Sequence, residues 1–292
     1  IRQLCKKCLI GRNKIMKPPK RFEHISSFHY ISIIVFFLIL VWAFDGAGFS
    51  FSKLFGSSEY IGRFLSEAFP PISEHRLSLS DFNRYILLLI ETAQMAIFGT
   101  FLGIIIGFLF ALMASRGLLG NSIPVRMLQV FAKFLITFMR TIPDLVWAII
   151  FVMVVGLGAF AGTLTIAIDT IGFVGRFFAE EMEDVERSAA EGIESSGASK
   201  LDSTFSAIIP AAMPGFITTS LFALEKSVRG SVVLGLVGAG GIGMELNSLF
   251  NWMAYDRAVI VIGLMFILIL FVEQISSYAR SKILDGSFKS RK

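Results

Sequence analysis

The fold class is decided by residues 86–114, ILLLIETAQMAIFGTFLGIIIGFLFALMA, a run that contains no charged residue from Thr92 onward. A helix needs about 20 mainly apolar residues to cross the hydrocarbon core of a bilayer, so this run is long enough to span a membrane. Gly99, Gly103 and Gly107 recur at every fourth position and therefore share one helical face. Small residues at this spacing let a second helix approach closely, which predicts a helix-packing surface.

The composition of the whole chain agrees with a lipid environment. Of its 292 residues, 54% are hydrophobic and 17% are charged, and the mean hydropathy is +0.72. A soluble domain has about a quarter charged residues. We therefore exclude the soluble globular, disordered, collagenous and disulfide-scaffold classes, and we predict an all-α polytopic membrane protein.

Outward from this run, the hydropathy pattern predicts six transmembrane helices. The stretch 49–85 after the first helix mixes acids, bases and two adjacent prolines, so we expect an extracytoplasmic loop there. After the second helix, Arg126, Lys133 and Arg140 recur every seven residues, as expected of an amphipathic helix lying at the inner surface. The six predicted spans are residues 28–48, 86–114, 141–158, 159–177, 211–237 and 252–275.

Basic residues are concentrated at the two ends of the chain. Nearly half of the 27 Lys and Arg residues lie within residues 1–21 and 280–292. The positive-inside rule then predicts two cytoplasmic tails, residues 1–27 and 278–292, which agrees with an even number of crossings. A nucleic-acid-binding arm is the disfavoured interpretation of these tails.

Three ionisable residues, Glu225, Lys226 and Arg229, fall within or at the outer end of the predicted fifth span. An ionisable side chain inside a membrane is costly and indicates function by default. Glu225 and Arg229 are four residues apart in the favourable order, so they can pair and leave Lys226 as a surplus cation. Asp169 is an alternative partner for either base. A positive lining would favour the passage of an anion, whereas the structural alternative is a pair that locks this helix to a neighbour.

Five glycines follow the fifth span between Gly235 and Gly243. Three of them match the glycines of the dinucleotide-binding pattern G-x-G-x-x-G. That pattern acts only between a strand and a helix of a βαβ unit, which the hydropathy does not support here. We predict non-helical backbone that lines a solute pathway, with a simple flexible loop as the alternative. The candidate pathway glycines are Gly238, Gly240, Gly241 and Gly243.

No motif in the sequence supports catalysis. The phosphate-binding pattern G-x-x-x-x-G-K-[ST] is absent, and the three histidines all precede residue 86. Cys5 and Cys8 lack the further ligands that a structural zinc site needs, so we expect two reduced thiols. We predict a transporter subunit that is not an enzyme and binds no cofactor or metal, so that any ATP and Mg²⁺ are bound by a separate ATPase.

The acidic cytoplasmic segment, residues 178–210, carries the sharpest pattern. Glu191, Gly197 and Pro210 follow one another at spacings of six and thirteen residues. This pattern resembles the EAA loop of permease subunits of binding-protein-dependent ABC importers, although residues 192–193 replace its two alanines. The resemblance implies that the loop forms a coupling helix that docks in a groove of the ATPase.

Other segments are similar to the phosphonate permease branch of that family. The resemblance covers residues 86–277 and implies a type I importer core like that of methionine permeases. The segments that carry it are Glu91–Thr100, Phe138–Trp147, Val155–Gly162 and Val232–Gly243.

The family resemblance also implies an assembly and a solute. It implies a homodimer in the bacterial inner membrane, two ATPase subunits and an extracytoplasmic binding protein, which together import phosphonate, phosphite or a related oxyanion by alternating access. Permeases for methionine or glycine betaine share the loop and the glycine-rich segment, so those solutes stay open. A secondary transporter that needs no ATPase is the alternative from another class.

Overall fold

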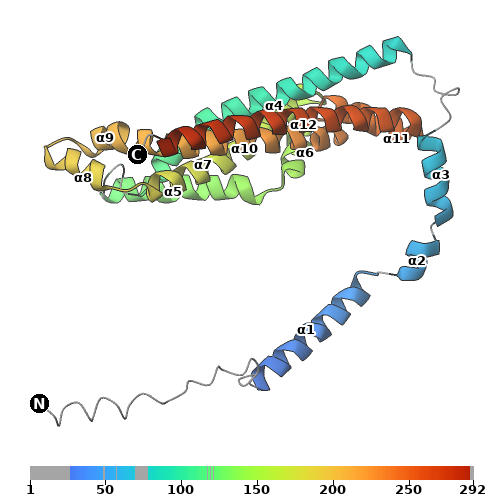
Figure 1. Ribbon diagram of the computed structural model, residues 1–292, viewed down its shortest axis with the longest axis horizontal. Coiled ribbons are helices and arrows are strands. Elements are labelled where there is room, and N and C mark those ends of the chain that lie inside the picture. Colours follow the sequence, from blue (N-terminus) through green and yellow to red (C-terminus); the bar gives the residue numbers. More distant parts are fainter. Residues whose placement is uncertain are drawn as a thin grey trace, which may run out of the picture. The chain divides into compact units, whose positions relative to one another are not determined.

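The computed structural model describes residues 27–48, 50–56, 58–69, 78–116, 118, 120 and 122–289 (Figure 1). All regular elements in these residues are helices, so the predicted all-α class is confirmed for them. The predicted tail 1–27, with Cys5 and Cys8, lies outside the described residues except for its last residue. The chain forms two compact units, residues 1–62 and 63–292.

The first unit contains an apolar helix, α1 (Ser27–Gly46), followed by α2 (Phe51–Gly56). Every side chain of α1 from Tyr30 onward is exposed, and most of them are Ile, Leu, Val or Phe. A helix that is apolar all round is typical of a membrane span. Over these residues α1 is shorter than the long apolar helices of the second unit. The next helix, α3 (Ser58–Ala68), begins in the first unit and ends in the second.

The second unit is a helical bundle in which α7 (Ala159–Asp184) makes its most extensive contact with α4. Many of the buried residues of α7 are glycine, alanine or threonine, and such small side chains let helices pack closely. The helices that pack against α7 are α4 (Leu79–Ala114), α5 (Ile123–Thr141), α6 (Asp144–Val155) and α10 (Ile209–Leu236). The remaining elements are α8 (Ser188–Ser195), α9 (Lys200–Ser203), α11 (Ile242–Asn251) and α12 (Tyr255–Lys289).

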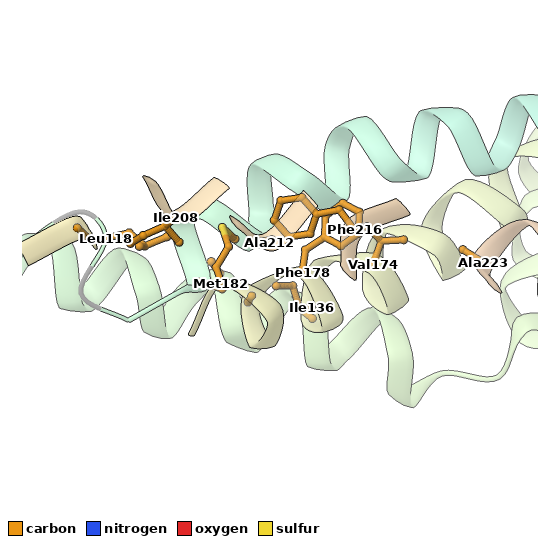
Figure 2. Close-up of a cluster of buried hydrophobic side chains, with 14 residues drawn as sticks. Leu118, Ile136, Val174, Phe178, Met182, Ile208, Ala212, Phe216 and Ala223 are labelled. Atoms are coloured by element: carbon orange, nitrogen blue, oxygen red, sulfur yellow. The ribbon is translucent and has the colours of Figure 1, made fainter. Parts of the chain in front are cut away.

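A cluster of buried apolar side chains lies between α4, α5, α7 and α10 (Figure 2). The rings of Phe178 and Phe216 have centroids 4.4 Å apart, and Phe108 lies edge-on to both at 6.2 and 5.9 Å. Figure 2 shows Leu118 and Ala223 towards opposite ends of this cluster. Lipid tails are as apolar as these side chains, so the cluster holds α7 to α10 through close packing of the rings.

Four helical segments of the second unit are long and apolar enough to cross a membrane. A fifth is added if α5 and α6, which are bent by 91° relative to each other, count as one broken span. The described residues therefore contain four or five candidate spans, and this is fewer than the six predicted. The four segments are Leu79–Ala114, Ala159–Asp184, Lys200–Leu236 and Tyr255–Ile283.

The predicted third span, residues 141–158, differs most from the structure. Only α6, with 12 residues, occupies it. Ile142 and Pro143 adopt extended conformations, with ψ of 124° and 143°, so the helix ends at Thr141 and a new one starts after the proline. A proline disfavours helical backbone at the residue before it, which explains the break.

The basic helix α5 also lies differently from the isolated surface helix that its charge spacing predicts. Lys133 lies 3.4 Å from Glu183 near the end of α7, while the guanidinium of Arg140 lies over the ring of Phe177, more than a turn earlier. α5 therefore runs antiparallel along α7. Its buried residues, Ala132 and Ile136, belong to the face that packs there.

Three helices extend beyond the predicted spans. α7 continues to Asp184, so the acidic segment 178–210 begins as the end of that helix. α12 continues to Lys289, so most of the predicted tail 278–292 is helical. α4 begins at Leu79, and the end of the predicted loop 49–85 is therefore helical too.

Candidate functional site

The segment between α7 and α10 folds into a helical hairpin made of α8 and α9. Glu191 lies exposed on α8, and Gly197 occupies the turn with φ +95°, a left-handed conformation that favours glycine. α9 then begins at a capping box, in which Ser199 Oγ accepts the Asp202 N–H at 3.2 Å and the Asp202 carboxylate accepts the Ser199 N–H at 3.1 Å. The local sequence thus sets both the turn and the helix that follows it.

Hydrogen bonds attach this hairpin to its neighbours. Arg187 Nη2 donates to the carbonyl of Arg116 at 2.9 Å, and the Arg116 N–H donates to Glu183 Oε1 at 2.8 Å. The Ser203 hydroxyl donates to Glu194 Oε1 at 2.9 Å, which ties α9 back to α8. A displacement of the hairpin is therefore transmitted to the ends of α4 and α7 as well as to α10.

Pro210 lies where the hairpin passes into α10. Thr204–Ile208 form a π-helical turn, and Pro210 follows it, exposed, in the first turn of α10. Proline has no N–H and cannot supply the regular helical hydrogen bond, so a widened turn beside it is a natural accommodation. α9, the π-helical turn and α10 are continuous in the chain from residue 200 to residue 236. A force on the hairpin therefore acts directly on α10.

A network of five charged side chains joins α7, α10 and α12. Lys226 Nζ donates to both carboxylate oxygens of Asp169 at 2.7 Å. Glu225, which is 5% exposed, accepts from Arg280 Nη2 at 2.7 Å and lies 3.6 Å from Arg229. The expectation that Lys226 is a surplus cation is wrong, because the packing of α7 on α10 brings Asp169 to it. A further acid, Asp144 of α6, lies beside Asp169, so the three bases are balanced by three acids. Arg229 is the most exposed of the three bases.

Arg280 is the member of this network that the sequence did not indicate. It lies 55 residues after Glu225, inside the predicted basic tail. Only the continuation of α12 past the predicted span brings its guanidinium back to α10. Glu225 is thereby bridged on two sides, once within its own helix and once across to α12.

The glycine-rich loop between α10 and α11 is closely packed within the protomer. Residues 239–243 are buried, and Gly238 is half-buried. A Cβ atom at Gly240 would overlap the start of α7 at Ala159, and one at Gly243 would lie 2.8 Å from Gly235 Cα. The absence of side chains therefore lets this loop touch the backbone of other elements directly.

Two hydrogen bonds fix the loop to the rest of the bundle. The Gly158 N–H donates to the carbonyl of Gly238 at 3.0 Å, which joins the α6–α7 turn to the loop. The Ile242 N–H donates to Thr92 Oγ1 at 2.8 Å, which joins the loop to α4. These two bonds hold the loop in one position relative to α4 and the start of α7.

The second of these bonds gives a stability prediction. Thr92 and Ile242 are both fully buried, so Thr92→Val removes the acceptor and leaves a buried N–H without a partner. We expect a loss of about 1–3 kcal/mol in the free energy of unfolding. Thr92→Ser keeps the hydroxyl and serves as the control. Thermal unfolding in detergent measures both variants, and equal midpoints for wild type and Thr92→Val would contradict the role of the bond.

The small residues of α4 face α7. A Cβ atom at Gly99 would lie 2.8 Å from Ile166 Cγ2, and one at Gly103 would overlap the side chain of Thr170. A Cβ atom at Gly107 would lie 3.3 Å from backbone atoms of α7. The two helices therefore approach to backbone contact along this face, and any larger residue at Gly103 forces them apart.

Comparisons with known proteins place this geometry in context. Residues 103–283, which include the hairpin and the charged network, match the family described as "Binding-protein-dependent transport system inner membrane component". The phosphite transport system permease protein PtxC of Stutzerimonas stutzeri is 30% identical over 247 residues, which are 85% of this chain and 86% of that protein. The phosphate-import permease protein PhnE of Mycolicibacterium smegmatis is 32% identical over 86% of this chain, which spans only 44% of that longer protein.

Solved structures share the fold. An inward-facing structure of the MetNI methionine ABC transporter superposes with a TM-score of 0.61 and 22% identity, and the match covers 71% of this chain and 99% of that one. An amino acid ABC transporter superposes with a TM-score of 0.57 and 17% identity, covering 71% of this chain and all of that one. At these identities the likeness concerns the fold alone.

Proposed function

The chain belongs to the family of inner membrane components of binding-protein-dependent transport systems, and from this premise we propose that it carries a phosphonate, phosphite or related oxyanion into the cytoplasm. Membership identifies the chain as the permease subunit of an ABC importer, distinct from the ATPase, as the resemblance of its cytoplasmic loop implies. The observation that carries the oxyanion assignment is the 30% identity with a phosphite permease over 85% of the chain.

The proposed topology has six crossings with both termini in the cytoplasm. The spans are α1, α4, the bent pair α5–α6, α7, α10 and α12. The apolar surface of α1 and the lengths of the four long segments support this count. In this topology residues 49–85 are mainly extracytoplasmic, and residues 86–277 form the importer core with the α8–α9 hairpin in the cytoplasm.

The proposed assembly is a homodimer of this chain in the bacterial inner membrane, with two ATPase subunits and an extracytoplasmic binding protein. The ATPase subunits bind ATP and Mg²⁺, and this chain binds neither. The family description names a dependence on a binding protein, and the fold is shared with a chain of an ABC transporter, which support this assembly.

The α8–α9 hairpin is the proposed coupling element. Glu191 is exposed on α8, where an ATPase could contact it, and the Gly197 turn sets the angle between α8 and α9. Pro210 marks the point at which the hairpin continues into α10. Closure of the ATPase dimer would push the hairpin, and the continuous helix would carry that push into the bundle.

The proposed pathway runs beside the charged network and the glycine loop. Glu225, Lys226 and Arg229 supply charge, and the exposed guanidinium of Arg229, which lies 3.6 Å from its carboxylate partner, lowers the electrostatic barrier for an anion. Gly238, Gly240, Gly241 and Gly243 supply a closely packed backbone wall beyond the end of α10. The alternative, that the network only locks α7, α10 and α12 together, is separated from this role by the Arg229 variant below.

Reconstitution tests the function. The complex of this chain with its ATPase and binding protein, placed in proteoliposomes, is expected to take up radiolabelled phosphite or methylphosphonate only with ATP and the binding protein. Methionine and glycine betaine serve as competing solutes, and uptake of either in place of the oxyanions would overturn the substrate assignment. Flux through the purified chain without ATP would instead support a secondary transporter.

Arg229→Ala is expected to slow oxyanion uptake about tenfold, because it removes the most exposed base of the network. Glu225 keeps its closer partner Arg280, so we expect the variant to fold and to co-purify with the ATPase as the wild type does. Lys282→Ala, which removes an exposed base of α12 outside the network, is the control. Unchanged uptake by Arg229→Ala would assign the residue a structural role only.

A further inference from the structure

A groove between α5 and α7 is not accounted for by the coupling hairpin or the charged network. Two cavities, of about 330 and 250 Å³, share Ile136, Thr137 and Arg176 and are therefore continuous. The groove starts beside Glu183, where α7 leads towards the hairpin, and ends beside Arg140. Its lining on α7 runs from Arg176 to Glu183, which is about 10 Å along the helix axis.

The charge of the groove is positive. Its lining contains four bases and two acids, a net charge of +2. Lys133 lies 3.4 Å from Glu183, and Arg176 lies 2.7 Å from Glu180. Arg140 has no carboxylate within 4 Å among the described residues, and its guanidinium contacts only the face of the Phe177 ring, at 5.8 Å. The fourth base is Arg116.

Close packing against α7 holds the backbone of Arg140 in place at the end of the groove that lies away from Glu183. A Cβ atom at Gly172 would lie 3.0 Å from Arg140 Cγ and 3.2 Å from its backbone nitrogen, so α5 rests directly on α7 there. The helix then ends because of Pro143, which leaves Arg140 in its last turn. Arg140 is exposed, so its guanidinium is accessible, and a base without an acidic partner is suited to hold an anion.

The two threonine hydroxyls that line the groove already donate hydrogen bonds to backbone carbonyl groups. The Thr137 hydroxyl donates to the Lys133 carbonyl at 2.7 Å, and the Thr141 hydroxyl donates to the Thr137 carbonyl at 2.8 Å. The donors left for a ligand are those of the basic side chains. A ligand rich in acceptors and negatively charged fits this set, and a neutral or cationic solute does not.

We propose that this groove binds a tetrahedral oxyanion between Arg140 and Arg176. Guanidinium groups match phosphate-like oxygens with two parallel hydrogen bonds each. The anion is either the free solute on its way out along α7, in which case the site rests on the proposed function, or the phosphate of an anionic lipid headgroup. Both sources present the same chemistry to the two arginines.

The test uses the purified permease–ATPase complex in a phosphate-free maltoside detergent. One arm measures equilibrium binding of inorganic phosphite and methylphosphonate by calorimetry. The other arm measures retention of phosphatidylglycerol by native mass spectrometry after mixing with micelles that contain it. Arg140→Gln and Arg176→Gln are expected to weaken the ligand that binds by about tenfold or more. Arg126→Gln is the matched control, since Arg126 is an exposed base of α5 that does not line the groove.

Each outcome decides the proposal. Loss of free-oxyanion binding in the two groove variants but not in Arg126→Gln supports a solute site, and loss of lipid retention alone supports a headgroup site. If neither arm distinguishes Arg140→Gln from Arg126→Gln, the groove does not bind oxyanions. Should Arg140→Gln fail to assemble, Arg140→Lys keeps the charge without the paired donors and is expected to bind with intermediate affinity. Oxyanion uptake by the wild-type complex, measured separately, shows whether the proposed function stands when the groove proposal fails.

Discussion

Replacing Gly197 with leucine is expected to abolish solute uptake while the chain stays in the membrane at its normal abundance. The turn between α8 and α9 holds this residue at φ +95°, and such a conformation costs a residue with a side chain about 1–3 kcal/mol. The turn would relieve that strain by changing its angle, and α8 would lose its orientation towards the ATPase. No atom lies within 4 Å of a Cβ atom at this position, so the bundle itself should be undisturbed.

Gly192 supplies a matched control for this prediction. It lies within α8, and a Cβ atom there would also meet nothing within 4 Å. Alanine is favoured over glycine inside a helix by about 1 kcal/mol, so Gly192→Ala should transport normally, whereas Gly197→Ala should already be impaired. Uptake, membrane abundance and ATP hydrolysis of the assembled complex are the measurements. Normal uptake by Gly197→Leu, or its disappearance from the membrane, would remove the support for a coupling role.

Replacing Gly103 with leucine is expected to remove most of the folded permease from the membrane. A Cβ atom alone would overlap the Thr170 side chain and lie 3.0 Å from the Ala167 carbonyl oxygen, and neither the backbone nor a β-branched side chain can move far. α4 and α7 would have to separate along their whole contact. We expect a loss of about 3 kcal/mol or more in the free energy of unfolding.

The same substitution at Gly263 on α12 serves as the control, because no neighbouring helix among the described residues contacts α12 at this position. Gly263 is exposed in the described protomer, and a Cβ atom there would meet nothing within 4 Å. Gly263→Leu should therefore keep near-normal abundance and a near-normal unfolding midpoint in detergent. If the two leucine variants behave alike, the close approach of α4 to α7 does not limit stability.

The sequence predicted the long apolar helices well, because hydropathy reports the solvent around each segment. The run 86–114 is contained in α4, and the four-residue spacing of its glycines lies on the face that packs against another helix. Nothing in that spacing identifies α7 as the neighbour. The partner depends on which helices the connections bring together, and this is a property of the whole chain.

Helix boundaries were harder to predict where polar residues continue a helix. The acids after Phe178 read as a loop, yet α7 continues to Asp184 because the apolar side chains of Phe178 and Met182 remain buried on one face. At Pro143 the error was the opposite one, because a helix was predicted to continue where the structure has a break. A hydropathy average over 141–158 is hardly changed by one proline. The consequence of this proline is a 91° bend between α5 and α6 in place of one straight span.

The charged network shows that residue spacing within one helix predicts only the contacts made inside that helix. The separation of Glu225 and Arg229 predicts their contact at 3.6 Å, but the shorter bonds come from Asp169 and Arg280 on other helices. Those two residues lie more than 50 positions away, so no periodicity within α10 reports them. The sequence offered Asp169 as an alternative partner for either base, and the structure pairs it with Lys226, whereas Arg280 was not indicated at all. Long-range ion pairs follow from helix packing, so the choice between such alternatives requires that packing.

The hydrogen bond between Gly158 and Gly238 closes one end of the α7–α10 pair, and the hairpin closes the other. Asp169 and Lys226 tie the two helices midway, and Phe178 stacks on Phe216 near the hairpin. Because these contacts restrain the pair at four levels, we expect it to move as a rigid body. In a dimer of this chain, the passage would open and close by rotation of one such block against the other, with little sliding of helices inside either copy.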